Sequence, residues 1–124
     1  MGEDSRRRLL VVCSETNEQE ILGSFFKDDK TQLDFALNDA EAQKLLSETD
    51  YDAVITDHLL PEIDGIGLYM SNSRIKHGNG EKFIFLTSKL TGIQEKFINL
   101  TGRPHLMRPV SLPLLERAVS RILK

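Results

Sequence analysis

The chain has 124 residues, of which 40% are hydrophobic and 28% are charged, and its formal net charge at pH 7 is −3. This balance is typical of one globular domain and excludes a fibrous or disordered chain. The negative charge gives no electrostatic basis for direct nucleic-acid binding, and no apolar run approaches the roughly 20 residues of a membrane span. Cys13 is the only cysteine, so an internal disulfide is impossible and we expect a reducing, cytoplasmic location.

Strand and helix patterns alternate in the first third of the chain. After residues 1–6, which we expect to be extended or disordered, Leu9–Cys13 has the apolar run of a buried strand. Residues 31–37 mix apolar and polar side chains, as in a strand near a sheet edge, and Asn38 is a suitable N-cap for the next helix. The apolar faces expected for the two helices contain Ile21, Leu22, Phe25 and Phe26, and then Ala42, Leu45 and Leu46.

A carboxylate ends the most apolar part of the middle of the chain. Residues 53–56 are short, apolar and rich in β-branched side chains, which favours a strand buried on both faces. The run stops at Asp57, and Pro61 and Gly65 then indicate a loop and a turn. Because open α/β sheets place their chemistry at the carboxyl ends of their strands, Asp57 is the first candidate functional residue.

The same alternation continues to the C-terminus. A helical segment after Gly65 extends to about His77, residues 83–86 form a buried strand that closes on Thr87, and residues 105–107 form a brief last strand. Gly102 is expected to end the helix between these strands, whose predicted apolar face consists of Ile93, Phe97 and Leu100. Ser111 caps the last helix, with Pro113 in its first turn and an apolar stripe of Leu115, Ala118, Val119 and Ile122.

Five strand–helix units in strict alternation predict an α/β fold with a doubly wound parallel sheet. The crossovers are expected to be right-handed, with helices on both faces of the sheet. No linker, repeat or low-complexity segment divides the chain.

The residues that end these strands resemble those of bacterial response-regulator receiver domains, over essentially the whole chain. That family has an acceptor Asp followed four residues later by Pro and eight later by Gly, matched here by Asp57, Pro61 and Gly65. Its fourth strand ends in Thr or Ser, matched by Thr87, and its fifth in Lys-Pro, replaced here by Arg108-Pro109. The resemblance implies one receiver-like domain over residues 1–124, with five strands in the order 2-1-3-4-5, five helices and the CheY-like, flavodoxin-like three-layer arrangement. It also implies a cis bond before Pro109.

The three strand-end residues suit a phosphoryl-transfer site. Asp57 is the candidate phosphoacceptor, Thr87 offers a hydroxyl donor for the transferred oxygens, and Arg108 offers a fixed charge and a planar fork for phosphate. Peptide N–H groups after the fourth strand can complete the anion site.

The metal site is where the chain departs from the family. Two adjacent acids after the first strand hold magnesium in receivers, and the matching positions here are Cys13 and Ser14. Magnesium requires hard oxygen ligands, so we expect neither a magnesium cofactor nor efficient magnesium-dependent phosphorylation. With those acids gone, the sequence predicts a direct ion pair between Asp57 and Arg108.

The histidines have mainly structural interpretations. His105 occupies the family position of a Tyr or Phe whose ring moves on activation, and a partly exposed edge residue is the alternative. His58 is expected at the mouth of the crevice, and His77 near a helix end.

Two functions of the same fold remain open. One is a signal-transduction receiver of a phosphorelay, phosphorylated on Asp57 by a histidine kinase or phosphotransfer protein and acting on an output domain or protein. The other is a degenerate receiver that acts as a phosphorylation-independent interaction module, through its last helix and fifth strand. We expect no enzyme, nucleic-acid or membrane function. A flavodoxin-like phosphate loop needs a glycine, and this chain has none directly after the first strand. A cysteine phosphatase needs an arginine at the position that Gln19 occupies.

Overall fold

The computed structural model describes residues 6–28, 30–57, 67–69 and 79–123. Expectations that concern His58, Pro61, Gly65, His77 and residues 1–5 lie outside this part of the chain. The described elements are β1 (Arg7–Val12), α1 (Thr16–Phe25), β2 (Thr31–Ala36), α2 (Asp39–Glu48), β3 (Ala53–Asp57), η1 (Asn79–Lys82), β4 (Phe83–Thr87), α4 (Gly92–Thr101), β5 (His105–Met107) and α5 (Leu112–Ile122). Residues 67–69 are also helical. No helix among the described residues has the length and apolar character to cross a membrane.

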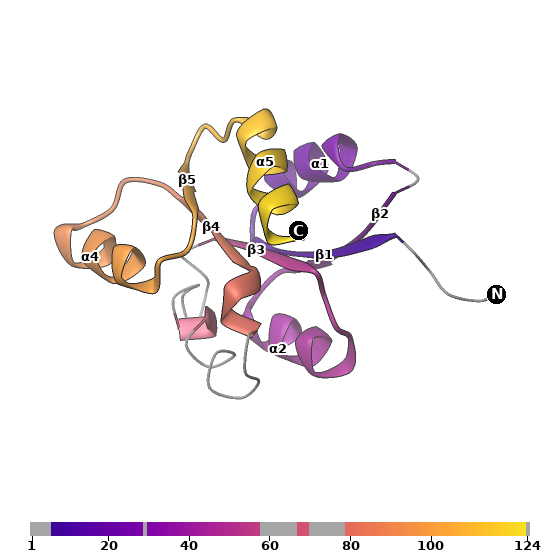
Figure 1. Ribbon diagram of the computed structural model, residues 1–124, viewed down its shortest axis with the longest axis horizontal. Coiled ribbons are helices and arrows are strands. Elements are labelled where there is room, and N and C mark those ends of the chain that lie inside the picture. Colours follow the sequence, from indigo (N-terminus) through magenta and orange to yellow (C-terminus); the bar gives the residue numbers. More distant parts are fainter. Residues whose placement is uncertain (1–5, 29, 58–66, 70–78, 124) are drawn as a thin grey trace.

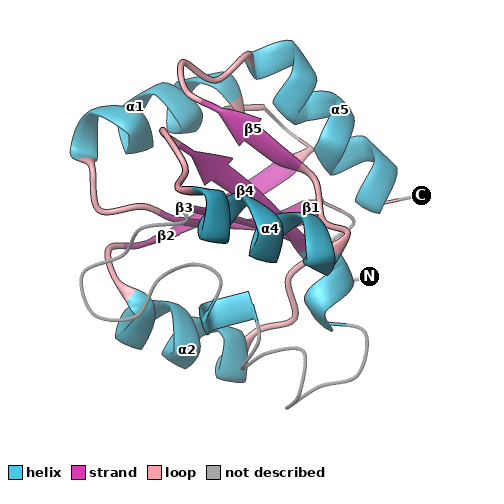
Figure 2. Cartoon of the chain, turned by 90° about the vertical axis from the view of Figure 1, so that its left-hand side faces the viewer, coloured by secondary structure: helices cyan, strands magenta, loops and turns pink. Residues whose placement is uncertain are grey.

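The five strands form one parallel sheet in the order β2-β1-β3-β4-β5, which confirms the predicted doubly wound fold (Figure 1). Alternate residues of a strand point to opposite faces, so each buried strand supplies two cores. Leu9 and Val11 of β1 pack with α1 and α5, whereas Leu10 and Val12 pack with α2. Figure 2 shows the resulting layers, with α1 and α5 on one face of the sheet and α2 on the other.

Local signals at the element ends match the structure. The Asn38 side chain accepts a hydrogen bond from the N–H of Glu41 at 2.9 Å and caps α2. Ser111 caps α5, and Gly102 ends α4 with a left-handed φ of 69°. The Arg108–Pro109 bond is cis, as the resemblance implied.

The first strand begins two residues earlier than predicted. Arg7 and Arg8 belong to β1, and Cys13 lies just after it. The Arg7 guanidinium donates to the Thr31 hydroxyl at 2.7 Å and forms a two-point contact with Glu116 at 2.7 and 2.9 Å. These partners from β2 and α5 stabilise a charged side chain within the sheet. A search for apolar runs cannot detect them, so it places the start of the strand too late.

The predicted apolar faces of two helices are partly or wholly wrong. In α1, Leu22 and Phe26 are buried, but Ile21 and Phe25 are exposed by 55% and 36%. In α4, the three residues assigned to the core are all exposed, and the buried residue is instead Ile98. Since α4 connects β4 to the short edge strand β5 (Figure 1), little sheet surface is available to cover its apolar face. The exposed fractions on α4 are 70% for Ile93, 50% for Phe97 and 73% for Leu100.

Candidate functional site

Four side chains of interest follow or end neighbouring strands at one edge of the sheet. Cys13 comes directly after β1, Asp57 is the last residue of β3, Thr87 is the last of β4, and Arg108 follows β5. Because all strands are parallel, their carboxyl ends lie at the same edge. The Asp57 side chain is only 15% exposed there.

Arg108 contacts Asp57 directly, which confirms the ion pair predicted from the sequence. The Arg108 Nη2 atom lies 3.1 Å from Asp57 Oδ2, and Nη1 lies 3.5 Å from Oδ1. Nη1 also lies 3.3 Å from the Ser88 hydroxyl. The acceptor candidate therefore lies beside a fixed positive charge.

Glu18, in the first turn of α1, makes the shorter contacts with the same guanidinium. Arg108 Nη2 donates to Glu18 Oε1 at 2.6 Å and Nε donates to Oε2 at 2.8 Å. The hydrogen bond to Glu18 raises the pKa of Arg108 against the opposing effect of burial, with a further contribution from Asp57. Burial opposes the ionisation of Glu18, but hydrogen bonds from Arg108 and Cys13 outweigh it and lower the pKa of Glu18.

Sequence reasoning missed the role of Glu18. Its position outside the predicted apolar face of the helix gave no reason to select it. The available signal was its position: an acid in the first turn of the helix after β1 lies near the carboxyl edge of the sheet. Because positions 13 and 14 carry no acid, a nearby acid on the following helix becomes a candidate site residue.

Cys13 is a buried neutral thiol within this cluster. Its Sγ lies 3.0 Å from Glu18 Oε1 and accepts from the N–H of Glu15 at 3.4 Å. Burial, together with the hydrogen bond to Glu18, raises the pKa of the thiol to about 12. The Gln19 side chain donates to the Cys13 carbonyl at 2.7 Å and closes the turn between β1 and α1.

The donor set does not fit the magnesium site that the resemblance implies. Cys13, Glu18 and Asp57 each place one ligand atom within 4.8 Å of the others. Of these, the sulfur is a soft and protonated ligand, and both carboxylates hold the Arg108 guanidinium. Ser14 is exposed and carries no charge. A divalent cation would have to displace Arg108 to reach these oxygens.

Thr87 lies at the site edge with its hydroxyl directed to the neighbouring strand. Its side chain is fully buried and its Oγ1 donates to the Leu106 carbonyl at 3.4 Å. Its own carbonyl accepts from the N–H of Arg108 at 2.8 Å, which fixes Arg108 relative to β4. Thr87 thus supports the backbone of Arg108, while its hydroxyl is engaged away from the Asp57 carboxylate.

A shallow cavity of about 730 Å³ opens beside Arg108. Ser88, Lys89 and Glu95 line it from the β4–α4 side, and His105 and Met107 line it from β5. His105 is exposed on this edge strand, in agreement with its structural interpretation.

The fold and the order of its strands are those of response-regulator receiver domains of the CheY-like class. The receiver domain of a signal transduction histidine kinase from Syntrophus aciditrophicus superposes with a TM-score of 0.84, at 24% identity, over 94% of this chain and 89% of that one. A second similar structure is the co-crystal structure of the Saccharomyces cerevisiae histidine phosphotransfer protein Ypd1 and the receiver domain of its downstream response regulator Ssk1. The matched chain superposes with a TM-score of 0.79, at 24% identity, over 95% of this chain and 89% of that one.

Two curated proteins also resemble the chain in sequence. The autoinducer 2 sensor kinase/phosphatase LuxQ of Vibrio harveyi is 41% identical over 64 residues, which cover 52% of this chain and 7% of LuxQ. The probable transcriptional regulator ycf29 of Porphyra purpurea is 29% identical over 102 residues, 82% of this chain and 49% of ycf29. The chain therefore spans less than half the length of either relative. No protein-family model matches it.

Proposed function

We propose that the chain is a phosphoryl-accepting receiver module of a two-component phosphorelay, with Asp57 as the acceptor. The observation that carries the proposal is the Asp57 carboxylate at the carboxyl edge of the sheet, 3.1 Å from the Arg108 guanidinium. A phosphoryl-transfer site needs little covalent machinery beyond an acceptor oxygen and well-placed positive charge. Both are present here, Asp57 at the end of β3 and Arg108 directly after β5.

In this mechanism an Asp57 oxygen attacks the phosphorus of a phosphohistidine. The phosphorus–nitrogen bond breaks, and the departing imidazole nitrogen keeps the electron pair and takes a proton from solvent. The Arg108 N–H groups then donate to the phosphoryl oxygens, and Ser88, exposed beside Arg108, adds a hydroxyl. The donor is a histidine kinase or a phosphotransfer protein, in keeping with the Ypd1–Ssk1 complex among the structural neighbours.

Incubation with radiolabelled acetyl phosphate tests the assignment. We expect the wild-type chain to take up one phosphoryl group as a hydroxylamine-sensitive acyl phosphate, and Asp57→Asn to take up none. Asp28→Asn, which changes an exposed aspartate remote from the cluster, is the matched control and should label like the wild type. Equal labelling of Asp57→Asn, or no labelling of the wild-type chain, would contradict the proposal.

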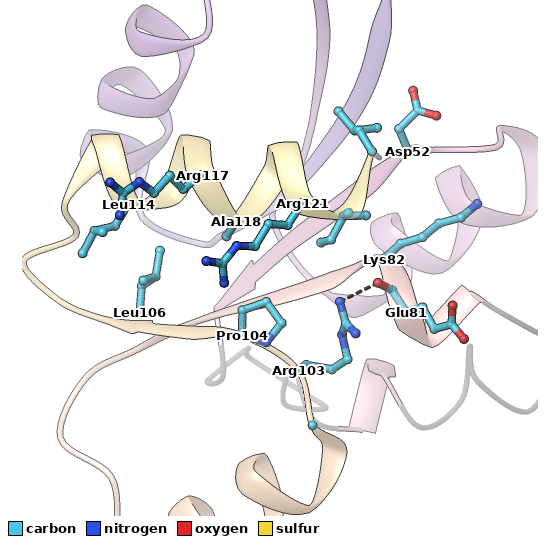
Figure 3. Close-up of a pocket in the computed structure, with 13 residues that line it drawn as sticks. Asp52, Glu81, Lys82, Arg103, Pro104, Leu106, Leu114, Arg117, Ala118 and Arg121 are labelled. Carbon is cyan, nitrogen blue, oxygen red and sulfur yellow. Dashed lines mark hydrogen bonds between the residues drawn. The ribbon is translucent and has the colours of Figure 1, made fainter.

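A second candidate, the phosphorylation-independent interaction module, is favoured by a basic groove against α5. This groove has a volume of about 900 Å³ and lies between α5, β5 and the residues that precede β3 and β4 (Figure 3). The cations Lys82, Arg103, Arg117 and Arg121 outnumber the acids Asp52 and Glu81 in its lining, which also contains apolar side chains such as Leu106 and Leu114. Within the described residues, the side chains of Lys82, Arg117 and Arg121 make no hydrogen bond or ion pair.

The chemistry of this groove specifies an acidic occupant. Arg103 donates to the carbonyls of Phe83 at 3.1 Å and Glu81 at 2.5 Å, so its own contacts are backbone oxygens (Figure 3). Burial lowers the pKa of Arg103, against smaller opposing effects of Tyr69 and Glu81. Arg117 and Arg121 lie one turn apart on α5 and match acids at a similar spacing. The occupant is therefore an acidic protein segment with interspersed apolar side chains.

A synthetic peptide of alternating glutamate and leucine residues provides the probe. We expect saturable, salt-sensitive binding that falls at least tenfold in the double variant Arg117→Glu, Arg121→Glu. The control carries the same charge change on exposed lysines of other elements, Lys27→Glu and Lys44→Glu, and should bind like the wild type. Equal losses in both variants would indicate net charge alone and would contradict a specific groove.

A further inference from the structure

Four hydrogen bonds and one further ion-pair contact hold the Arg108 guanidinium, and their acceptors divide into two groups. The edge formed by Nε and Nη2 makes the short contacts with Glu18, at 2.8 and 2.6 Å. The other edge makes longer contacts, 3.1 and 3.5 Å to Asp57 and 3.3 Å to Ser88. One edge of the guanidinium is thus firmly held, while the edge facing the acceptor is loosely engaged.

The place where a receiver needs a cation is therefore already filled by a side chain. The possible ligands around Asp57 do not suit magnesium, because one is a thiol and the two carboxylates already contact the Arg108 guanidinium. We propose that Arg108, positioned by Glu18, takes the place of the divalent cation, so that Asp57 accepts a phosphoryl group without any metal ion. This inference rests on the proposed phosphoacceptor function of Asp57 and specifies how that site works.

The step is complete without a metal or an added proton. With acetyl phosphate as donor, an Asp57 oxygen forms a bond to phosphorus, the bond between phosphorus and the acetate oxygen breaks, and acetate leaves with the electron pair. The phosphoryl oxygens then accept the Nη1 and Nη2 hydrogens that now point to Asp57 and Ser88. A guanidinium fork suits two such oxygens at once, as in other phosphate sites.

Glu18 acts in this scheme as a positioning residue. Its two oxygens occupy Nε and one hydrogen of Nη2, so Arg108 cannot rotate away when the Asp57 contacts rearrange. Glu18 is 18% exposed and also lies 3.0 Å from the Cys13 sulfur, so its own position is fixed by packing. Small displacements of a charged group at a reacting centre are costly in rate, which gives Glu18 an effect on labelling.

The experiment compares acetyl phosphate labelling in EDTA and in magnesium. We expect the wild-type rate to be the same within about twofold in the two conditions, and Arg108→Gln to lose at least tenfold in EDTA. Lys44→Gln, which removes a positive charge from an exposed lysine of α2, should label like the wild type. Glu18→Ala should also lose labelling in EDTA, and Glu18→Gln should regain part of it because an acceptor oxygen for Arg108 remains.

Each outcome separates the inference from the function on which it rests. Labelling of the wild type only in magnesium would leave Asp57 as the acceptor and overturn the metal-free site. Labelling in EDTA that survives in Arg108→Gln would overturn the role of Arg108, and unchanged labelling of Glu18→Ala would overturn that of Glu18. No labelling in either condition would remove the acceptor function itself.

Discussion

Replacing Arg108 by alanine is expected to lower the free energy of unfolding by about 2–4 kcal/mol. The substitution leaves the carboxylates of Glu18 and Asp57, 18% and 15% exposed, close together without their shared cation. Urea denaturation measures the change. Arg117→Ala removes an arginine that has no ion pair in the described part of the chain, and it should change stability by no more than about 0.5 kcal/mol.

A double-mutant cycle attributes this loss to the ion pair. We expect Arg108→Ala and Glu18→Ala together to cost less than the sum of the single changes, because the second substitution removes a charge that the first leaves unpaired. The coupling should be on the order of 1–3 kcal/mol. Strict additivity, or an Arg108→Ala variant as stable as Arg117→Ala, would show that the contacts contribute little.

The Cys13 thiol is expected to react with iodoacetamide at pH 8 about a thousandfold more slowly in the folded chain than in urea. Burial and the hydrogen bond to Glu18 raise the pKa of Cys13 from an ordinary value of 9.0 to about 12, and only the thiolate is nucleophilic. Mass spectrometry of the alkylated chain gives both rates. Similar rates in the two states would mean that Cys13 is neither buried nor perturbed as described.

The same shift predicts an alkaline loss of stability. Because the folded pKa lies above the unfolded one, the thiol stabilises the fold fully below about pH 9, and this contribution disappears as pH rises towards 12. The loss approaches about 4 kcal/mol at the upper limit, at 1.36 kcal/mol per unit. Cys13→Ala removes the titrating group, so its stability should fall less steeply over this range.

The elements and their order were predictable because each depends on local chemistry. The β-branched run of residues 53–56 and the apolar run of residues 83–86 are both short, which favours strands buried on both faces. Asn38, Gly102 and Ser111 mark helix ends through their own hydrogen-bonding or backbone preferences, and the structure confirms all three.

Helix faces were less predictable because burial depends on what lies opposite. The apolar spacing of Ile93, Phe97 and Leu100 is regular, yet the edge strand β5 has only three residues to pack against. Periodicity identifies an apolar stripe but does not say whether the sheet covers it. The result is an exposed apolar stripe on α4.

The candidate site was predictable in part. The ion pair was predicted from Asp57 and Arg108 at two strand ends together with the absence of acids at positions 13 and 14, and the structure contains it. The partner that holds Arg108 most tightly was not predictable from strand ends, since Glu18 comes from the first turn of a helix and lies 90 residues away in the chain. The Thr87 hydroxyl donates to the Leu106 carbonyl, and its role toward a phosphoryl group stays a prediction.

Titration of the Glu18 carboxyl carbon by NMR tests the central claim, that one guanidinium organises this edge of the sheet. We predict a Glu18 pKa below its ordinary value in the wild-type chain, because the hydrogen bonds from Arg108 and Cys13 outweigh burial. In Arg108→Ala the pKa should rise, since the strongest of these bonds is lost. A Glu18 pKa of about 4.3, as in an unperturbed glutamate, that is the same in both proteins would contradict this claim.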